Sequence, residues 1–262
     1  MLEAITLGLI QGITEWLPVS SEGVIAGIGH IFFDKEPIEA IFFALWLHMG
    51  TALAAIITFN SIIKNYLKEL VDSPGDLSPT LRFLICSCLI SGIIGGSIIL
   101  ILSNFSNNTV TGIMQYFMTI LGVFMTISGI VLMLRKKRFV PRILGAEPWL
   151  DSVIAGSAQG LAVIPGLSRS GLTISALLVR KFDTKEALTL SFLMSIPASI
   201  GAGLIALAND SVALTTESVV ALTVSFITGL LVIKGILRIA DQISFGPFII
   251  VIGLILFAGS FI

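Results

Sequence analysis

Long runs of apolar residues recur along most of the chain, separated by short polar segments. Six of them are long enough to cross a bilayer as helices, which takes about 20 residues. They cover residues 38–59, 81–102, 110–134, 187–208, 216–239 and 245–262. The pattern predicts an all-α polytopic membrane protein with about six transmembrane helices.

Two further apolar stretches, residues 2–31 and 150–179, are interrupted midway by proline, glycine and serine. The interruptions are Pro-Val-Ser-Ser at 18–21 and Pro-Gly-Leu-Ser at 165–168. Because proline removes a backbone donor and clashes with the preceding turn, each stretch is expected to break into two half-helices. Broken backbone at membrane depth is tolerated where protein or water covers it, which favours two re-entrant helical hairpins. Two kinked through-helices are the alternative.

Composition supports a membrane protein. The 262 residues are 55% hydrophobic and 12% charged, about half the charged fraction of a soluble domain, and the mean hydropathy is +1.04. A net charge of −1 excludes a broadly basic nucleic-acid binder, so no nucleic acid is expected as a partner. No basic residue precedes the first apolar stretch, so we expect the N-terminus to stay in the mature protein.

The basic residues orient the predicted crossings. Arg135–Arg138 follow the third apolar run, and such clusters mark the cytoplasmic side. The loops at 103–109 and 209–217 contain no Lys or Arg, which suits the outside. Counting crossings from the basic cluster, the first hairpin opens outward, the second opens inward, and both termini lie outside.

An internal repeat relates the two interrupted stretches. A shift of 148 positions aligns Gly8 with Gly156, Gln11 with Gln159, Gly12 with Gly160, Ser20 with Ser168, and Gly23 with Gly171. We therefore expect a single membrane domain over 1–262, with repeat 1 at about 2–134, repeat 2 at about 150–262 and a basic cytoplasmic linker at about 135–149. Inverted-topology repeats place their site near the midplane, where the broken helices meet.

Most ionisable residues lie in loops or at the ends of segments, and Lys234 can extend to the inner interface. Four exceptions lie deeper. Glu15, Glu22 and Arg169 are at or beside the two breaks, and His48 is inside the first crossing. An ionisable group at membrane depth costs several kcal/mol and usually lines a functional cavity. The structural alternatives are a buried pair of Glu15 and Arg169 that clips the halves together, and a packing role for His48.

The two breaks offer groups that bind an anion. Serines before a resumed helix are typical N-caps, and each second half-helix presents free N–H groups and the positive end of its dipole. The guanidinium of Arg169 matches phosphate oxygens bidentately. Hydroxyls surround it in both motifs, on Ser20, Ser21, Ser168, Ser170 and Thr173. Phosphate is the expected anion.

Gln11 and Glu15 are four residues apart and share a helix face just before the first break. A carboxylate beside phosphate is repulsive unless a divalent cation bridges the two or the carboxylate acts as a general base. The serine hydroxyls serve as nucleophiles or only as donors. These groups suit metal-assisted phosphoryl transfer on a lipid.

Both motifs resemble those of the undecaprenyl-diphosphate phosphatase (bacitracin-resistance) family. Residues 11–21, Gln-Gly-Ile-Thr-Glu-Trp-Leu-Pro-Val-Ser-Ser, resemble its Glu/Gln-x-x-x-Glu motif. Residues 165–173, Pro-Gly-Leu-Ser-Arg-Ser-Gly-Leu-Thr, resemble its Pro-Gly-x-Ser-Arg-Ser-x-x-Thr motif, with every fixed position filled. Length, crossing count and repeat also fit, so the resemblance covers the whole chain.

The resemblance implies hydrolysis of a C55 isoprenoid diphosphate to the monophosphate and inorganic phosphate, with a divalent cation, Mg²⁺ or Ca²⁺, at a site reached from the outer leaflet. By position, Glu15 is the essential acidic residue and metal ligand, and Gln11 is the permitted variant of its partner. Ser21 matches the candidate nucleophile and Arg169 the phosphate-binding arginine. The remaining substrate-binding positions are Ser20, Gly166, Ser168, Ser170 and Thr173.

One position departs from the family pattern. Many members continue Ser-Ser-Thr-Gly-His, whereas residues 20–24 read Ser-Ser-Glu-Gly-Val. The histidine that the pattern places at Val24 is missing. Glu22 is a candidate for proton transfer in its place, a metal-bound water without such help is another, and His48 is a more remote substitute.

The sequence therefore predicts an undecaprenyl-diphosphate phosphatase of the cell membrane with its active site on the extracytoplasmic side. It would recycle the lipid carrier for cell-envelope glycan synthesis and give bacitracin resistance. The main alternative is a polyprenyl-phosphate flippase, because inverted repeats are common in transporters; an interaction protein with a vestigial site is a third. The expected partners are the polyprenyl diphosphate lipid and the bilayer, with a homodimer left open.

Overall fold

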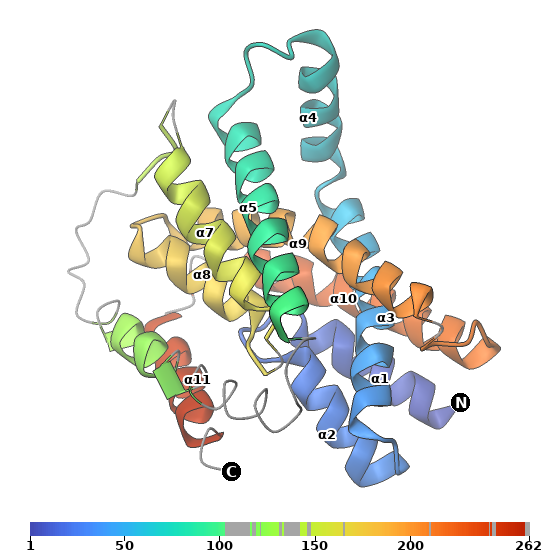
Figure 1. Ribbon diagram of the computed structural model, residues 1–262. Helices are drawn as coiled ribbons and strands as arrows, with labels where there is room; N and C mark the ends of the chain where they lie inside the picture. Colours follow the sequence, from blue (N-terminus) through green and yellow to red (C-terminus); the bar gives the residue numbers. More distant parts are fainter. Residues whose placement is uncertain are drawn as a thin grey trace. The chain divides into compact units, whose positions relative to one another are not determined.

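The computed structural model describes residues 1–102, 116, 119–120, 122–130, 133, 142–145, 148–164, 166–209, 211–240, 242 and 245–259. Every regular element among these residues is an α-helix (Figure 1). The helices are α1 (Leu2–Thr14), α2 (Ser21–Phe33), α3 (Pro37–Thr58), α4 (Asn60–Asp72), α5 (Pro79–Leu102), α7 (Trp149–Leu161), α8 (Arg169–Val179), α9 (Thr184–Ala208), α10 (Thr216–Ile239) and α11 (Phe245–Gly259).

Four of the described helices are long and apolar enough to cross a membrane: α3, α5, α9 and α10. They coincide with four of the six predicted crossings, which confirms an all-helical chain with membrane-spanning candidates. About half of the predicted crossing at 110–134 and most of the predicted linker at 135–149 fall outside the described residues. The last predicted crossing coincides with α11, which has 15 residues.

The interruptions between α1 and α2 and between α7 and α8 confirm the two predicted breaks. α1 ends at Thr14 and α2 begins at Ser21, while α7 ends at Leu161 and α8 begins at Arg169. α1 packs against α2, and α7 packs against α8. The interruptions around Pro18 and after Leu161 therefore separate two pairs of short helices.

The helices form two compact units, each drawn from both halves of the sequence. Unit 1 comprises Met1–Leu77 and Phe192–Arg238, and unit 2 comprises Ser78–Ser191 and Ile239–Ile262. α9 belongs to unit 2 up to Ser191 and to unit 1 from Phe192 onward. The two predicted repeats are thus not the two compact units.

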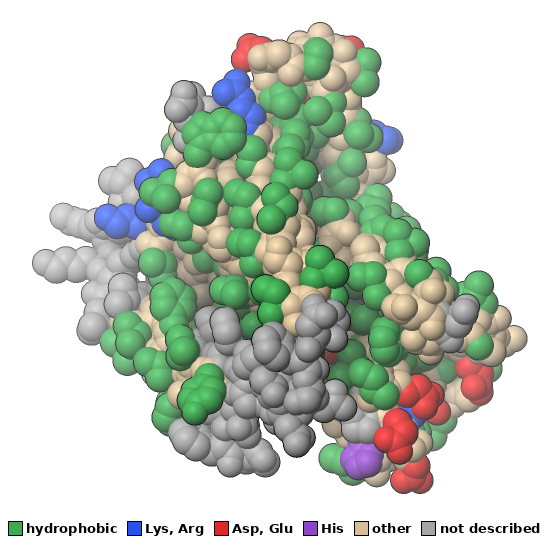
Figure 2. All heavy atoms as spheres, in the orientation of Figure 1, with side chains coloured by type: hydrophobic (Ala, Val, Ile, Leu, Met, Phe, Trp, Pro, Cys, Tyr) green, Lys and Arg blue, Asp and Glu red, His purple; other side chains and the backbone are tan. Residues whose placement is uncertain are grey.

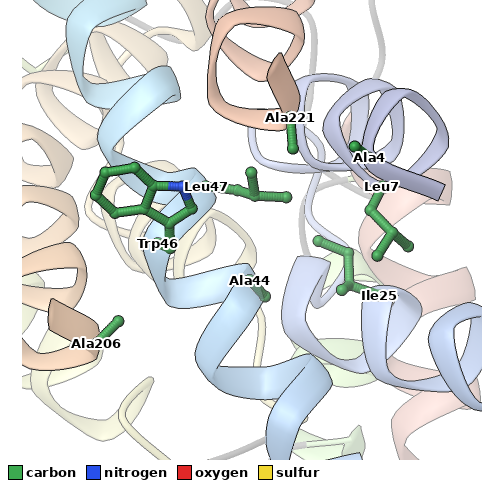
Figure 3. Packing of buried hydrophobic residues seen from close by; sticks show 8 residues of the cluster. All are labelled: Ala4, Leu7, Ile25, Ala44, Trp46, Leu47, Ala206 and Ala221. Atoms are coloured by element: carbon green, nitrogen blue, oxygen red, sulfur yellow. The ribbon is translucent and has the colours of Figure 1, made fainter. Parts of the chain in front are cut away.

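Unit 1 is held together by a buried apolar cluster (Figure 3). Its side chains come from α1, α2, α3, α9 and α10: Ala4, Leu7, Ile25, Ala44, Trp46, Leu47, Ala206 and Ala221. The indole N–H of Trp46 donates to the carbonyl of Ser218 at 3.0 Å. Between membrane helices such side chains stabilise through van der Waals packing rather than through removal from water, and this cluster packs α1 and α2 against α3.

Glycines let the first helix of each pair approach a long helix closely. In unit 1, a Cβ added to Gly8 would overlap the carbonyl of Ala221 on α10. In unit 2, a Cβ added to Gly156 would lie 2.6 Å from the carbonyl oxygen of Ser87 on α5. Gly8 and Gly156 are the aligned glycines of the internal repeat, so α1 packs on α10 as α7 packs on α5. Small residues permit such close backbone contact between membrane helices.

An ion pair closes the open end of the first helix pair. Glu3, in the first turn of α1, pairs with Lys35 at 3.0 Å, just after α2. Lys35 also pairs with Glu39 at 2.7 Å. Burial opposes the charge of Lys35, but its hydrogen bonds to Glu39 and Glu3 outweigh this and raise the pKa of its ammonium group.

The second helix pair is closed in the same way. Asp151, in the first turn of α7, is buried and accepts a hydrogen bond from Arg180 at 2.6 Å, at the end of α8. Its second oxygen pairs with Arg142 at 3.0 Å. Asp151 stands 148 residues after Glu3. In both helix pairs, therefore, an acid at the start of the first helix pairs with a base at or just after the end of the second.

Hydrophobic side chains also cover outer faces of the spans. Figure 2 shows them predominating over the visible face of α5 and α7 in unit 2. On α5, Leu89, Ile93 and Leu100 are all more than 60% exposed. A soluble domain rarely exposes so much contiguous apolar surface, and this surface is suited to lipid.

Gly12→Ala should destabilise unit 1. The added Cβ would lie 2.6 Å from the Cβ of Thr228 and 2.9 Å from the carbonyl oxygen of Ser225, and such overpacking costs about 1–3 kcal/mol. Gly27→Ala on α2 is the matched control, because its Cβ meets nothing within 4 Å; alanine should there gain up to about 1 kcal/mol of helix propensity. The fraction of monodisperse protein after heating in detergent measures both. Equal stability of the two variants would contradict the packing described.

Candidate active site

The first group of predicted site residues lies at the junction of α1 and α2. Gln11 and Glu15 are both buried, and the Gln11 side-chain amide donates to Glu15 Oε2 at 2.9 Å. This bond spans one helical turn and confirms that the two residues share a face. Glu15 is the C-cap residue of α1, directly after Thr14.

The start of α2 brings its hydroxyls and second carboxylate to the same place. The Ser20 side chain accepts a hydrogen bond from the Gly23 N–H at 3.2 Å, which confirms the predicted N-cap. The Ser20 hydroxyl also donates to Glu22 Oε2 at 3.3 Å. Ser21 is buried, and its hydroxyl donates to Glu15 Oε2 at 3.1 Å. A buried hydroxyl hydrogen-bonded to a carboxylate is the arrangement of an activated nucleophile and its base.

His48 of α3 completes this group. Its Nε2 lies 3.2 Å from Glu15 Oε2 and 3.3 Å from Glu22 Oε1. Its Nδ1 lies 2.6 Å from the carbonyl oxygen of Ala44. All three partners are acceptors, so both ring nitrogens must carry hydrogen for these contacts to be hydrogen bonds. His48 is thus in contact with both carboxylates of the site group.

The second group lies at the start of α8. Ser168 is the N-cap, and its side chain accepts from the Gly171 N–H at 3.1 Å. Its backbone angles, φ −76° and ψ 112°, nearly equal those of Ser20, φ −72° and ψ 106°. The hydroxyls of Ser168 and Ser170 lie 3.3 Å apart. Arg169 is the first residue of α8, where the backbone N–H groups and helix dipole favour an anion.

Buried hydroxyls support this helix start from behind. The Thr173 hydroxyl donates to the carbonyl of Arg169 at 2.9 Å and lies 2.6 Å from the hydroxyl of Ser191. Gly166, in the preceding turn, has φ 88°, a conformation that other residues adopt at a cost. The predicted residues of this motif therefore lie in one locally ordered turn.

The two groups have similar backbone geometry at their N-caps but side chains of opposite charge. Position 21 holds serine, and the position 148 residues later holds Arg169; Glu15 corresponds to Val163. Both carboxylates therefore belong to unit 1, and the guanidinium belongs to unit 2. The first group is acidic and rich in hydroxyls, and the second carries the guanidinium.

Two side chains of the first group, Gln11 and Glu15, carry oxygen atoms of the kind that hard divalent cations prefer. Among the described residues, no group of three or more His, Cys, Asp or Glu could hold a metal ion by itself. Gln11 Oε1, however, is buried and has no hydrogen-bond partner in the described part of the chain, one turn before Glu15. Mg²⁺ commonly takes one or two protein oxygens and completes its shell with water and substrate phosphate.

Two contacts of the site were not predicted. His48 stands 33 residues after Glu15, and Ser191 stands 18 residues after Thr173, so helix periodicity connects neither pair. The one usable signal for His48 was an ionisable side chain inside an apolar run. For Ser191 the sequence offered none, because serine is common in membrane helices.

The chain resembles known proteins over nearly its whole length. A family model described as "Bacitracin resistance protein BacA" matches residues 4–257. An "Undecaprenyl-diphosphatase" of Methanococcoides burtonii is 38% identical, over 97% of this chain and 96% of that protein. Proteins of the same name from Methanothrix thermoacetophila and Haloarcula marismortui are 34% and 33% identical, over 98% and 94% of this chain and 96% and 92% of theirs. The chain belongs to the bacitracin resistance protein family.

Proposed function

We propose that this protein hydrolyses undecaprenyl diphosphate to undecaprenyl phosphate and inorganic phosphate. The observation that carries the proposal is the buried contact of the Ser21 hydroxyl with Glu15 Oε2 at 3.1 Å. The names of the three relatives and the shared family support the substrate. The product is the lipid carrier in reusable form, and its recycling would give bacitracin resistance.

Ser21 and Glu15 perform the first step. The Ser21 oxygen attacks the terminal phosphorus, while Glu15 takes the hydroxyl proton and passes it to the leaving group. The bond between the terminal phosphorus and the bridging oxygen breaks, and the lipid monophosphate leaves. Water then attacks the phosphoserine, Glu15 transfers a proton from that water to the Ser21 oxygen, and inorganic phosphate is released.

Arg169 binds the diphosphate and compensates its charge. Its fork can hold two phosphate oxygens, and the N–H groups at the start of α8 bind the same anion. We propose that α1–α2 and α7–α8 are re-entrant hairpins of an inverted repeat that enter from opposite faces. The matching N-caps, closing ion pairs and glycine contacts of the two pairs support this arrangement.

The divalent cation belongs to the same proposal. Gln11 Oε1 and the Glu15 carboxylate would hold Mg²⁺ or Ca²⁺ beside the substrate phosphates. Bound there, the cation would neutralise charge on the phosphate oxygens. The chain itself keeps these two side chains buried and one helical turn apart.

Phosphate release by the purified protein in detergent tests the enzyme directly. We expect release from undecaprenyl diphosphate when Mg²⁺ or Ca²⁺ is present, and loss of release on chelation. A flippase would instead move a labelled polyprenyl monophosphate between the leaflets of liposomes without releasing phosphate. That result would replace the proposed function with the transporter.

The site should open to the extracytoplasmic side, so that the diphosphate enters laterally while its isoprenoid tail stays in lipid. The topology behind this predicts Ala213 outside and Gly75 inside. In a Cys86→Ala/Cys88→Ala background, an impermeant thiol reagent added to intact cells should label Ala213→Cys and spare Gly75→Cys. Both positions are exposed, so permeabilised cells should show labelling of both. The reverse pattern in intact cells would place the site on the cytoplasmic side.

A further inference from the structure

His48 connects the two carboxylates of the site from a third helix. Glu15 lies at the end of α1 and Glu22 in the first turn of α2, and both meet His48 Nε2 on α3. His48 is 6% exposed, and its other nitrogen is held by the carbonyl of Ala44 at 2.6 Å. The ring therefore has a fixed orientation, and its free edge faces the carboxylates.

Two carboxylates in one buried site repel each other unless a donor lies between them. Glu15 is 4% exposed, so it cannot turn toward water. The side chain of Glu22 is 26% exposed and is held by His48 and by the Ser20 hydroxyl. The donors from Gln11, Ser21 and His48 all meet the same atom, Glu15 Oε2, so each of them constrains how that carboxylate can rotate.

We infer that His48 is a positioning residue for the hydrolysis proposed above. It holds the Glu15 carboxylate where Ser21 can donate to it, and it holds Glu22 next to the same point. An imidazole from α3 thus occupies the site in a chain that carries Val24 where the family pattern has histidine. Because His48 acts through Glu15, its loss should lower kcat and leave KM for the lipid nearly unchanged.

The side chains of glutamine and asparagine separate this role from simple packing. The Nε2 atom of glutamine can take the place of His48 Nε2 and donate one hydrogen to each carboxylate, whereas asparagine is one methylene shorter and matches only the Nδ1 position. His48→Gln should keep kcat within about threefold of wild type. His48→Asn should lower kcat at least about tenfold, with KM within about twofold. Both variants place a neutral amide in the same buried site, so the cost of burying a polar group predicts no difference in kcat between them.

Controls make the experiment decisive. His30→Asn changes the other histidine, which is exposed near the end of α2, and should leave kcat and KM unchanged. Melting of each variant in detergent shows that it is folded. If His48→Asn is unstable, the kcat of His48→Gln alone tests the positioning role. A role in packing alone gives no reason why an unbranched amide should restore kcat.

The failures are distinguishable. Wild-type protein that releases no phosphate from undecaprenyl diphosphate overturns the proposed function and this inference with it. An active wild type with folded His48→Gln and His48→Asn variants of equal kcat overturns only the role of His48. A tenfold rise in KM at unchanged kcat does the same, since it would place His48 in lipid binding.

Discussion

Arg169→Lys should lower phosphate release from undecaprenyl diphosphate at least about 30-fold. Lysine keeps the positive charge at the start of α8 but loses the planar fork that binds two phosphate oxygens. An oriented catalytic cation is worth at least about 2 kcal/mol in the transition state, which corresponds to that factor. The measurement is kcat/KM of purified protein at saturating Mg²⁺ or Ca²⁺.

Arg238→Lys is the matched control for this substitution. Arg238 is exposed in the last turn of α10, so the same change of side chain should there leave the rate unaltered. Equal expression and equal melting of the two variants show that insertion is intact. A rate above about half of wild type for Arg169→Lys would exclude bidentate phosphate binding by Arg169.

Glu15→Gln should be inactive, with a loss of at least about 100-fold. The amide has nearly the same shape as the carboxylate, but it cannot take a proton from Ser21, and a positioned general base contributes about 10²–10⁴-fold. It is also a weaker ligand for a divalent cation. Single-turnover phosphate release at several metal concentrations separates the two losses, because added metal corrects only the second.

Glu36→Gln serves as the control, because Glu36 is exposed before α3 and its side chain makes no capping hydrogen bond. Gln11→Glu tests the neighbouring position, where a second carboxylate should be tolerated or improve the use of metal. A Glu15→Gln protein with wild-type turnover would remove Glu15 from the mechanism.

Local features of the site could be predicted from the sequence. Proline within an apolar run predicted the ends of α1 and α7, and serines just before a resumed apolar helix predicted the caps at Ser20 and Ser168. Helix spacing predicted the contact of Gln11 with Glu15. Each of these depends on residues within one or two turns, where backbone geometry leaves few arrangements.

Contacts between distant helices could not be predicted in this way. The position of His48 depends on how α3 packs against α1 and α2, and that packing is set by the apolar cluster around Leu7 and Leu47 rather than by any spacing. The ion pair of Asp151 with Arg180 likewise depends on how α7 packs against α8 and on no spacing in the sequence. The division into compact units was also unexpected, because the repeat defines halves by sequence, whereas helix packing pairs α1 with α10 and α7 with α5.

This cross-pairing sets the order in which the chain can fold as it is synthesised. When α7 emerges, its partner α5 is already in place, so Gly156 can meet Ser87 at once. Gly8 must wait for Ala221, more than 200 residues later, although N-terminal segments otherwise tend to fold first. The first helix to be made can therefore meet α2 and α3 early, but its glycine face is among the last surfaces to be covered. A chain that stops before α10 leaves the glycine face of α1 uncovered.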